Sequence, residues 1–173
     1  SGIVAVRSGA LLAAEYIGQH SDAFPRMVCW QPVLNGKSFL TQFLRIRIAA
    51  ALDQGGDRQT TSDMRAVLSQ GSSIEVGGYE LNGRLAEAMD STALDKHTSC
   101  FSTSGANLDI QWFESRSSTE TGLSIASQRL LDQWNDSGVS VQPYCFEGPA
   151  FWQLHERTLV PDLLSQTTDM MDQ

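Results

Sequence analysis

Four short apolar runs alternate with helical stretches, and this alternation constrains the fold more than any other feature of the chain. The apolar runs cover residues 3–6, 26–30, 107–114 and 139–146. The stretches with helical composition or periodicity include residues 9–20, 38–53, 82–89 and 123–135. Such alternation is typical of a parallel sheet flanked by helices. We therefore predict a three-layer α/β fold whose sheet has about four mainly parallel strands, ordered first to fourth.

Composition excludes several classes of protein. Of the 173 residues, 41% are hydrophobic, which is enough for one packed core. The formal net charge is −8 without a basic cluster, so we expect no nucleic-acid partner. No apolar run reaches the roughly 18 residues of a membrane span, so we expect no membrane association. The odd number of cysteines, without metal-like spacing, predicts reduced thiols in the cytoplasm and no metal or cofactor.

The pattern divides the chain into a core and an insertion. We expect residues 1–34 and 96–173 to build one core, interrupted by a helical, cap-like insertion over residues 35–95. Within the insertion, residues 74–76 could form a short strand followed by a turn at Gly77 and Gly78. Pro143 predicts an edge position or a bulge for the fourth strand, and Pro161 predicts the start of the last helix. We expect the whole chain to be a single domain.

Residues 3–6 (Ile-Val-Ala-Val) lack polar alternation, which predicts a strand buried on both faces. This strand leads through Arg7 and Ser8 into a helix, the arrangement of a nucleophile elbow. A tight elbow requires small residues two positions before and after its apex. Ala5 and Gly9 meet this requirement if the apex is Arg7.

Three further segments carry a family resemblance when they are combined with the elbow. They are residues 30–45 (WQPVLNGKSFLTQFLR), 78–81 (GYEL) and 148–153 (GPAFWQ). With these segments the chain resembles the exosortase A system-associated hydrolases, a bacterial branch of the α/β-hydrolase superfamily. The resemblance covers only the second half of that fold and implies that residues 38–90 are its cap. The first four strands and the usual oxyanion-hole loop would then be absent.

The resemblance also indicates where catalytic residues should lie. Acyl transfer needs a nucleophile, an imidazole base and a carboxylate that orients the imidazole. At these places the chain has Arg7 at the apex, Glu114 after the third strand of the core, and no histidine in residues 148–152; His155 lies just beyond. We therefore expect degenerate machinery that binds a small anionic or acyl ligand through Arg7, Gly9 and Lys37.

Two alternatives stay open. The first is an ester or thioester hydrolase with an altered constellation of Ser8, Glu114 and His155. The second is a non-enzymatic fragment or subunit that a partner chain completes. The edge of the strand over residues 3–6 would offer unpaired backbone groups, so we expect a homo-oligomer or a missing N-terminal half at this edge.

Several residues also have purely structural interpretations. The hydroxyl of Ser8 could cap the helix that follows, and Arg7 could pair with Glu114. His20 and His97 lie in polar surroundings, so we expect both to face solvent. Cys29 and Cys145 lie within apolar strands and are expected to be inert core thiols. Trp112, Phe113, Phe151 and Trp152 are expected to pack in the core.

Overall fold

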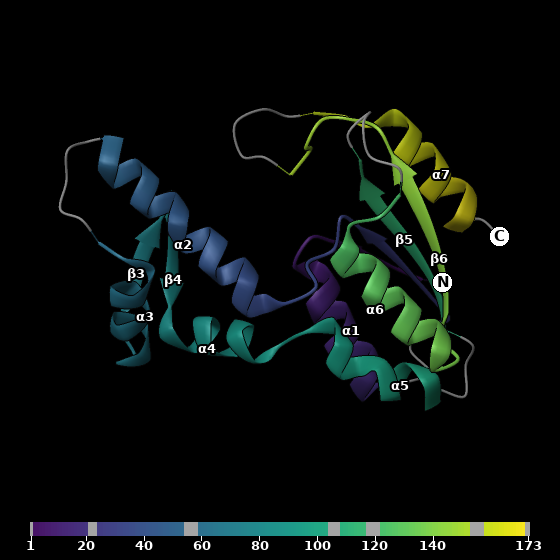
Figure 1. The fold of residues 1–173 in the computed structure, drawn as a ribbon, viewed down its shortest axis with the longest axis horizontal. Coiled ribbons are helices and arrows are strands. Elements are labelled where there is room, and N and C mark those ends of the chain that lie inside the picture. The colour runs from purple at the N-terminus through teal and green to yellow at the C-terminus, as the bar shows by residue number, and fades with distance from the viewer. Residues whose placement is uncertain are drawn as a thin grey trace. The chain divides into compact units, whose positions relative to one another are not determined.

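Each of the four apolar runs forms a strand of one parallel sheet in the computed structural model (Figure 1). The strands are β1 (Ile3–Val6), β2 (Arg26–Trp30), β5 (Asp109–Ser115) and β6 (Ser140–Phe146). They are ordered β1-β2-β5-β6, and each neighbouring pair is parallel. The predicted α/β fold with strands in chain order is therefore confirmed. Pro143 lies in β6, an edge strand, as expected.

The structure describes residues 2–20, 24–53, 59–103, 108–116, 122–152 and 158–171, with the backbone alone at 52, 53 and 103. Contacts divide the chain into two compact units. Unit 1 comprises Ser1–Leu34 and Leu94–Gln173, and unit 2 comprises Asn35–Ala93. That the two units form a single domain stays a prediction.

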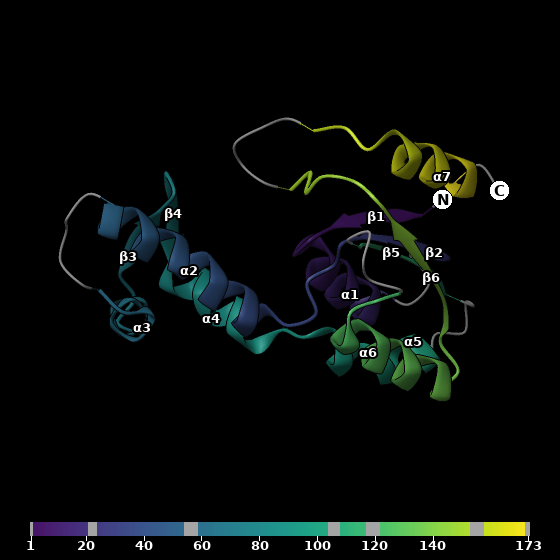
Figure 2. The ribbon, with the colours of Figure 1, turned by 45° about the horizontal axis from the view of Figure 1, so that its top comes forward.

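Helices cover both faces of the unit 1 sheet, which gives three layers (Figure 2). One face carries α1 (Gly9–Gln19), α5 (Thr98–Thr103) and α6 (Ile125–Asp136), with the 3-10 helix η1 (Leu94–His97) before α5. The opposite face carries α7 (Pro161–Met171). The rings of Trp112 and Trp134 meet edge-on at 5.9 Å between β5 and α6. Phe113, the next residue of β5, instead packs in the cluster that contains Leu163 of α7.

The helices α1, α6 and α7 and the four strands lie close to their predicted positions. Their ends differ from the predicted ones by a few residues. Pro161 begins α7, as its position predicted. None of the described helices is long and apolar enough to cross a bilayer.

Unit 2 combines three helices with a hairpin. Its elements are α2 (Gly36–Asp53), α3 (Thr61–Ser69), β3 (Ser73–Val76), β4 (Tyr79–Asn82) and α4 (Gly83–Ser91). The strands pair antiparallel across Gly77 and Gly78, which both have positive φ (58° and 82°). The predicted turn is therefore present, but the second strand of the hairpin was not expected. The core of unit 2 lies between the hairpin and the helices and contains Leu44, Met64 and Val76.

One prediction for the sheet is wrong: β1 is not buried on both faces. Ala5 is buried, but Val4 and Val6 are 43% and 41% exposed. Val4 and Val6 share their face with Val28 and Trp30 of β2, because these residues are register partners in the parallel ladder. On that face α7 covers β2 and β5 and leaves the edge strand partly open.

Candidate functional site

The turn after β1 holds Arg7 in the left-handed backbone conformation, with φ of 52°. Backbone hydrogen bonds fix this turn from both sides. The N–H of Arg7 donates to the carbonyl of Trp30 (3.0 Å), and the carbonyl of Arg7 accepts from the N–H groups of Ala10 (3.2 Å) and Val33 (3.1 Å). Arg7 therefore lies at the apex of a strand–turn–helix bend, where a nucleophile elbow would carry its nucleophile.

Residues beside the apex have less defined roles than the sequence suggested. Ala5 is buried, as a tight bend requires, but a Cβ at Gly9 would meet no atom within 4 Å. Ser8 has helical dihedral angles (φ −65°, ψ −15°), and its hydroxyl makes no capping hydrogen bond. The expectation that Ser8 caps α1 through its side chain is wrong, because capping geometry normally needs an extended residue at this position.

The Arg7 guanidinium has two partners among the described residues. Nη1 donates a hydrogen bond to the Gln31 carbonyl at 3.1 Å, and the guanidinium carbon lies 4.9 Å from the centre of the Trp152 ring. Arg7 is half-buried, and burial lowers its pKa, yet a guanidinium stays charged at physiological pH. Among the described residues no carboxylate pairs with Arg7, so the expected ion pair with Glu114 is absent there.

Gln31 connects the ends of three neighbouring strands. It also has positive φ (43°), and its carbonyl accepts from Arg7 beyond β1. Its N–H donates to the Phe113 carbonyl (2.7 Å), and its side-chain oxygen accepts from the N–H of Ser115 (2.6 Å). Gln31 was not among the residues that the sequence singled out for the site. Trp152 was expected to pack in the core, but it is partly exposed.

Glu114 is engaged in holding β5 to α6. It is only 7% exposed, and each of its carboxylate oxygens accepts a hydrogen bond. Oε2 accepts from the Trp112 indole (3.2 Å), and Oε1 accepts from the N–H of Ser124, the residue that caps α6 (2.9 Å). A carboxylate at a helix N-terminus is favourable because it faces the positive end of the helix dipole. These contacts give Glu114 a structural role.

The described histidines lie away from the elbow. His20 stacks on Tyr16 at the C-terminal end of α1, about 18 Å from Ser8 at 1.5 Å per residue. His97 is buried, with Nε2 3.6 Å from a carboxylate oxygen of Glu15, so its expected exposure is wrong. Glu15 itself lies about 10 Å along α1 from Ser8. His155 lies outside the described residues.

Lys37 and the cysteines singled out from the sequence add no partner to the Arg7 guanidinium within the described part of unit 1. Lys37 is exposed in the first turn of α2, in unit 2, so its joint action with Arg7 stays a prediction. Burial raises the pKa of Cys29 to about 12, as expected for a core thiol, whereas Cys145 is only partly buried. In the described part of the chain, no three His, Cys, Asp or Glu side chains gather as potential metal ligands.

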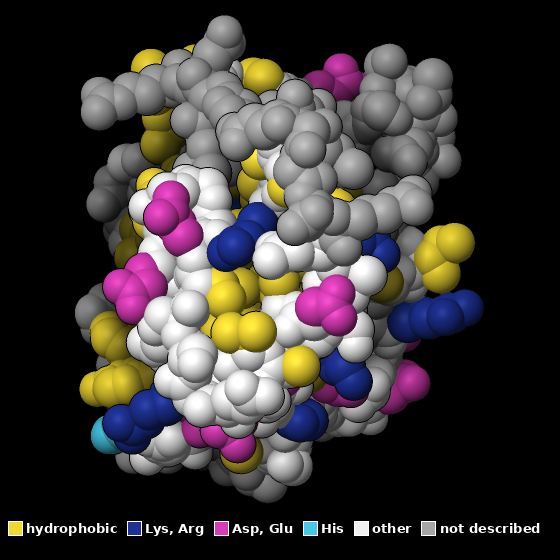
Figure 3. All heavy atoms as spheres, turned by 90° about the vertical axis from the view of Figure 1, so that its left-hand side faces the viewer, with side chains coloured by type: hydrophobic (Ala, Val, Ile, Leu, Met, Phe, Trp, Pro, Cys, Tyr) yellow, Lys and Arg dark blue, Asp and Glu magenta, His cyan; other side chains and the backbone are white. Residues whose placement is uncertain are grey.

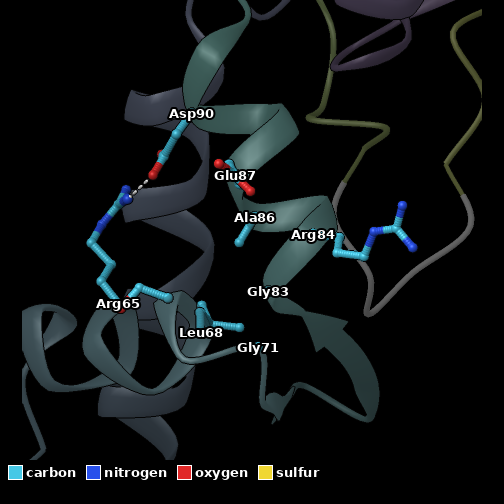
Figure 4. Close-up of a pocket in the computed structure, with 9 residues that line it drawn as sticks. Arg65, Leu68, Gly71, Gly83, Arg84, Ala86, Glu87 and Asp90 are labelled. Atoms are coloured by element: carbon cyan, nitrogen blue, oxygen red, sulfur yellow. Dashed lines mark hydrogen bonds and ion pairs between the residues drawn. The ribbon is translucent and has the colours of Figure 1, made fainter.

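Unit 2 contains a cavity of about 300 Å³ between α3 and α4 (Figure 4). Arg65 and Asp90 form an ion pair on one side of it, whereas the Arg84 side chain points away. Arg65 also donates to the Thr41 hydroxyl (2.9 Å). A Cβ at Gly83 would collide with the Leu68 carbonyl oxygen, so the two helices are in close contact at the cavity. The arginine and aspartate beside the cavity are therefore used in packing unit 2.

The face of the molecule that Figure 3 shows carries acidic and basic side chains interspersed with small apolar patches. Among the side chains coloured there, no large patch of one charge forms. A patch of clustered Lys and Arg is what binding to a phosphate backbone requires.

Comparison with known proteins gives little further information. No family model matches the chain, and no curated protein matches it. The resemblance to exosortase A system-associated hydrolases is thus without support from these comparisons and stays a prediction. Among solved structures, the chain is similar to a thioesterase domain from the curacin biosynthetic pathway, with 12% identity and a TM-score of 0.36. The similarity covers 85% of this chain, which spans 58% of that domain. At this level it assigns no activity.

Proposed function

We propose that the elbow binds the carboxylate of a small acyl ligand against Arg7 and that the chain does not hydrolyse esters. The observation that carries this proposal is the guanidinium at the left-handed apex, held between the Gln31 carbonyl and the Trp152 ring. A guanidinium has five N–H donors in a planar fork, and only one of them is used by a described residue. The remaining donors suit the two oxygens of a carboxylate.

The position of Arg7 supports an anionic ligand. A cation at a helix N-terminus is unfavourable by about 0.3–1 kcal/mol. The N–H groups of Ser8 and Gly9, which precede the first hydrogen bonds of α1, have no acceptor among the described residues. An anion at this place would accept hydrogen bonds from these N–H groups. Its negative charge would offset both the Arg7 guanidinium and the positive end of the α1 dipole.

The surroundings of the guanidinium favour an acyl chain on the anion. Phe151 lies 5.1 Å from the Trp152 ring and 5.9 Å from the Trp30 ring, measured between centroids. Each of these rings is partly exposed, so they offer apolar surface beside the charge. A fatty carboxylate such as octanoate therefore matches the site better than inorganic phosphate.

Ester hydrolysis by Ser8, Glu114 and His155 is the competing function. Ser8 follows the apex and belongs to the start of α1, and both oxygens of Glu114 already accept hydrogen bonds. We expect no labelling of Ser8 by a fluorophosphonate and no turnover of p-nitrophenyl butyrate. A burst of p-nitrophenol that Ser8→Ala abolishes would establish the hydrolase instead.

Calorimetric titration with octanoate tests the binding proposal. We expect saturable binding that Arg7→Asn weakens roughly 10-fold to 150-fold, because a hydrogen bond to a charged group contributes about 1.5–3 kcal/mol. Asparagine tolerates the left-handed conformation, so the turn should persist. Arg129→Asn, which removes the same charge from an exposed position on α6, serves as the control. Equal affinity in Arg7→Asn and the wild type would refute the proposal.

A further inference from the structure

At the outer edge of β1, backbone groups without a strand partner among the described residues coincide with apolar side chains. In the parallel ladder, the N–H of Arg7 donates to Trp30, so the amide groups of the odd-numbered residues point toward β2. The N–H and C=O groups of Val4 and Val6 therefore point away from the sheet. The side chains of Val4 and Val6 are also more than 40% exposed, whereas Ala5 between them is buried.

Apart from the short length of β1, which has four residues, this edge lacks the usual protection against strand pairing. Proteins block an edge strand by keeping it short, or with a lysine, a proline, a bulge or a covering element. Residues 3–6 contain no charge and no proline, and β1 pairs in regular register along its whole length. Within the described part of unit 1, β2 is the only strand that pairs with β1.

We propose that β1 pairs antiparallel with β1 of a second copy about a two-fold axis at Ala5. In this register Val4 lies opposite Val6 of the other copy, and the two residues exchange both backbone hydrogen bonds. The two-fold axis repeats this pairing of Val4 with Val6, so four backbone hydrogen bonds form. Residues opposite each other in an antiparallel pair share a face of the sheet, so all four valines meet on one face. The axis places the small Ala5 opposite Ala5 of the other copy, on the other face.

The same strand therefore supplies both halves of the interface, as a two-fold axis requires. A register centred on Val4 or on Val6 would leave one valine of each copy without a valine opposite it. The two sheets join into one of eight strands, and the faces that α7 leaves open at Val4 and Val6 become adjacent. This pairing does not depend on a ligand at Arg7.

Sedimentation of the 173-residue chain tests the proposal. We expect a mass twice the 18.9 kDa of one chain. Val6→Pro should give a monomer, because Pro removes an outward N–H and leaves the bonds to β2 intact. Leu159→Lys, which changes another exposed apolar residue of unit 1, should remain dimeric. A monomer at about 100 µM wild-type chain, where a micromolar Kd would give mostly dimer, overturns the proposal.

A cross-linking measurement tests the register and does not depend on the folding of Val6→Pro. Ala5 would lie opposite itself in a non-hydrogen-bonded pair, whose Cα separation of about 4.5 Å suits a disulfide. Ala5→Cys should form a covalent dimer under mild oxidation, whereas the wild-type chain with its three cysteines should not. A dimer that resists cross-linking at this position, or that persists in folded Val6→Pro, would contradict the proposed pairing.

Discussion

Two residues with side chains that normally avoid positive φ meet at the candidate site. Arg7 and Gln31 follow neighbouring strands, and a hydrogen bond joins the Arg7 side chain to the Gln31 carbonyl. A left-handed conformation costs about 1–2 kcal/mol for such residues. The sequence could indicate the bend after β1, because a strand runs directly into a helix there. It could not indicate the conformation of Gln31, since neither glutamine nor its neighbours favour positive φ.

Replacing Gln31 separates its backbone role from its side-chain role. Gln31→Ala and Gln31→Gly both remove the acceptor for the Ser115 N–H, but only glycine relieves the left-handed conformation. We expect Gln31→Gly to be more stable than Gln31→Ala by about 1 kcal/mol in chemical denaturation. Glycine should be less stable than alanine inside a helix, so we expect Ala88→Gly in α4 to lower the free energy of unfolding by about 1 kcal/mol. Equal stability of the two Gln31 variants would show that the left-handed backbone at residue 31 is not strained.

Among the helices and strands, those with a strong apolar pattern in their own residues are the ones that the sequence predicts. The buried strands β2 and β5 and the helix α6 carry strong apolar signals, and all three were predicted. The strand β4 (Tyr-Glu-Leu-Asn) has a weak pattern and forms by pairing with the neighbouring β3. The short helices at residues 94–103 also have weak patterns, and they contact α1, which is distant in sequence. Glu114 was assigned correctly to the end of β5, but its partner Ser124 became visible only in the fold.

Glu114→Gln should destabilise the junction of β5 and α6. A glutamine side chain has one oxygen acceptor and one NH2 donor, whereas Glu114 accepts hydrogen bonds with both oxygens. The NH2 group would therefore point at the N–H of either Trp112 or Ser124, where two donors cannot bond. We expect a loss of about 1–3 kcal/mol in the free energy of unfolding, measured with urea. Glu147→Gln, which breaks an exposed ion pair with Arg116, should change stability by less than about 1 kcal/mol. Equal losses of stability in Glu114→Gln and Glu147→Gln would contradict the structural role assigned to Glu114.

The N-terminus of α3 should make stability depend on pH. Hydrogen bonds from the Thr60 hydroxyl and N–H lower the pKa of Asp63. A lowered folded-state pKa stabilises the protein above the unfolded pKa of about 3.9, and that stabilisation is lost as the pH falls through the folded value. Asp63→Asn should therefore lose less stability than the wild type between pH 7 and pH 3. Identical pH dependence in both proteins would exclude this contribution.

At the scale of the whole molecule, the insertion leaves and returns at adjacent residues. The Leu94 N–H donates to the Leu34 carbonyl at 2.9 Å, within unit 1. The sequence predicts the insertion over residues 35–95 because none of the four apolar runs falls between residues 30 and 107. It gave no information on how unit 2 packs internally, since that packing depends on the unexpected hairpin.

Unit 1 should fold without unit 2. Replacing residues 35–93 with a Gly-Ser linker keeps the Leu34–Leu94 contact and every strand of the parallel sheet. We expect the shortened chain to keep an α/β circular dichroism spectrum and to unfold in one cooperative transition. The isolated unit 2 serves as the comparison. Loss of cooperative unfolding in the shortened chain would show that unit 1 needs the insertion.

Binding of a carboxylate by the guanidinium at the elbow can be observed on Arg7 itself. Nitrogen-15 spectra of the arginine side chains, recorded during titration with octanoate, report on this contact. We expect a saturable shift of the Arg7 side-chain signals, identified by their loss in Arg7→Asn, with Arg129 unchanged. Arg7 signals that stay in place while octanoate binds, or that move no more than those of Arg129, would contradict it.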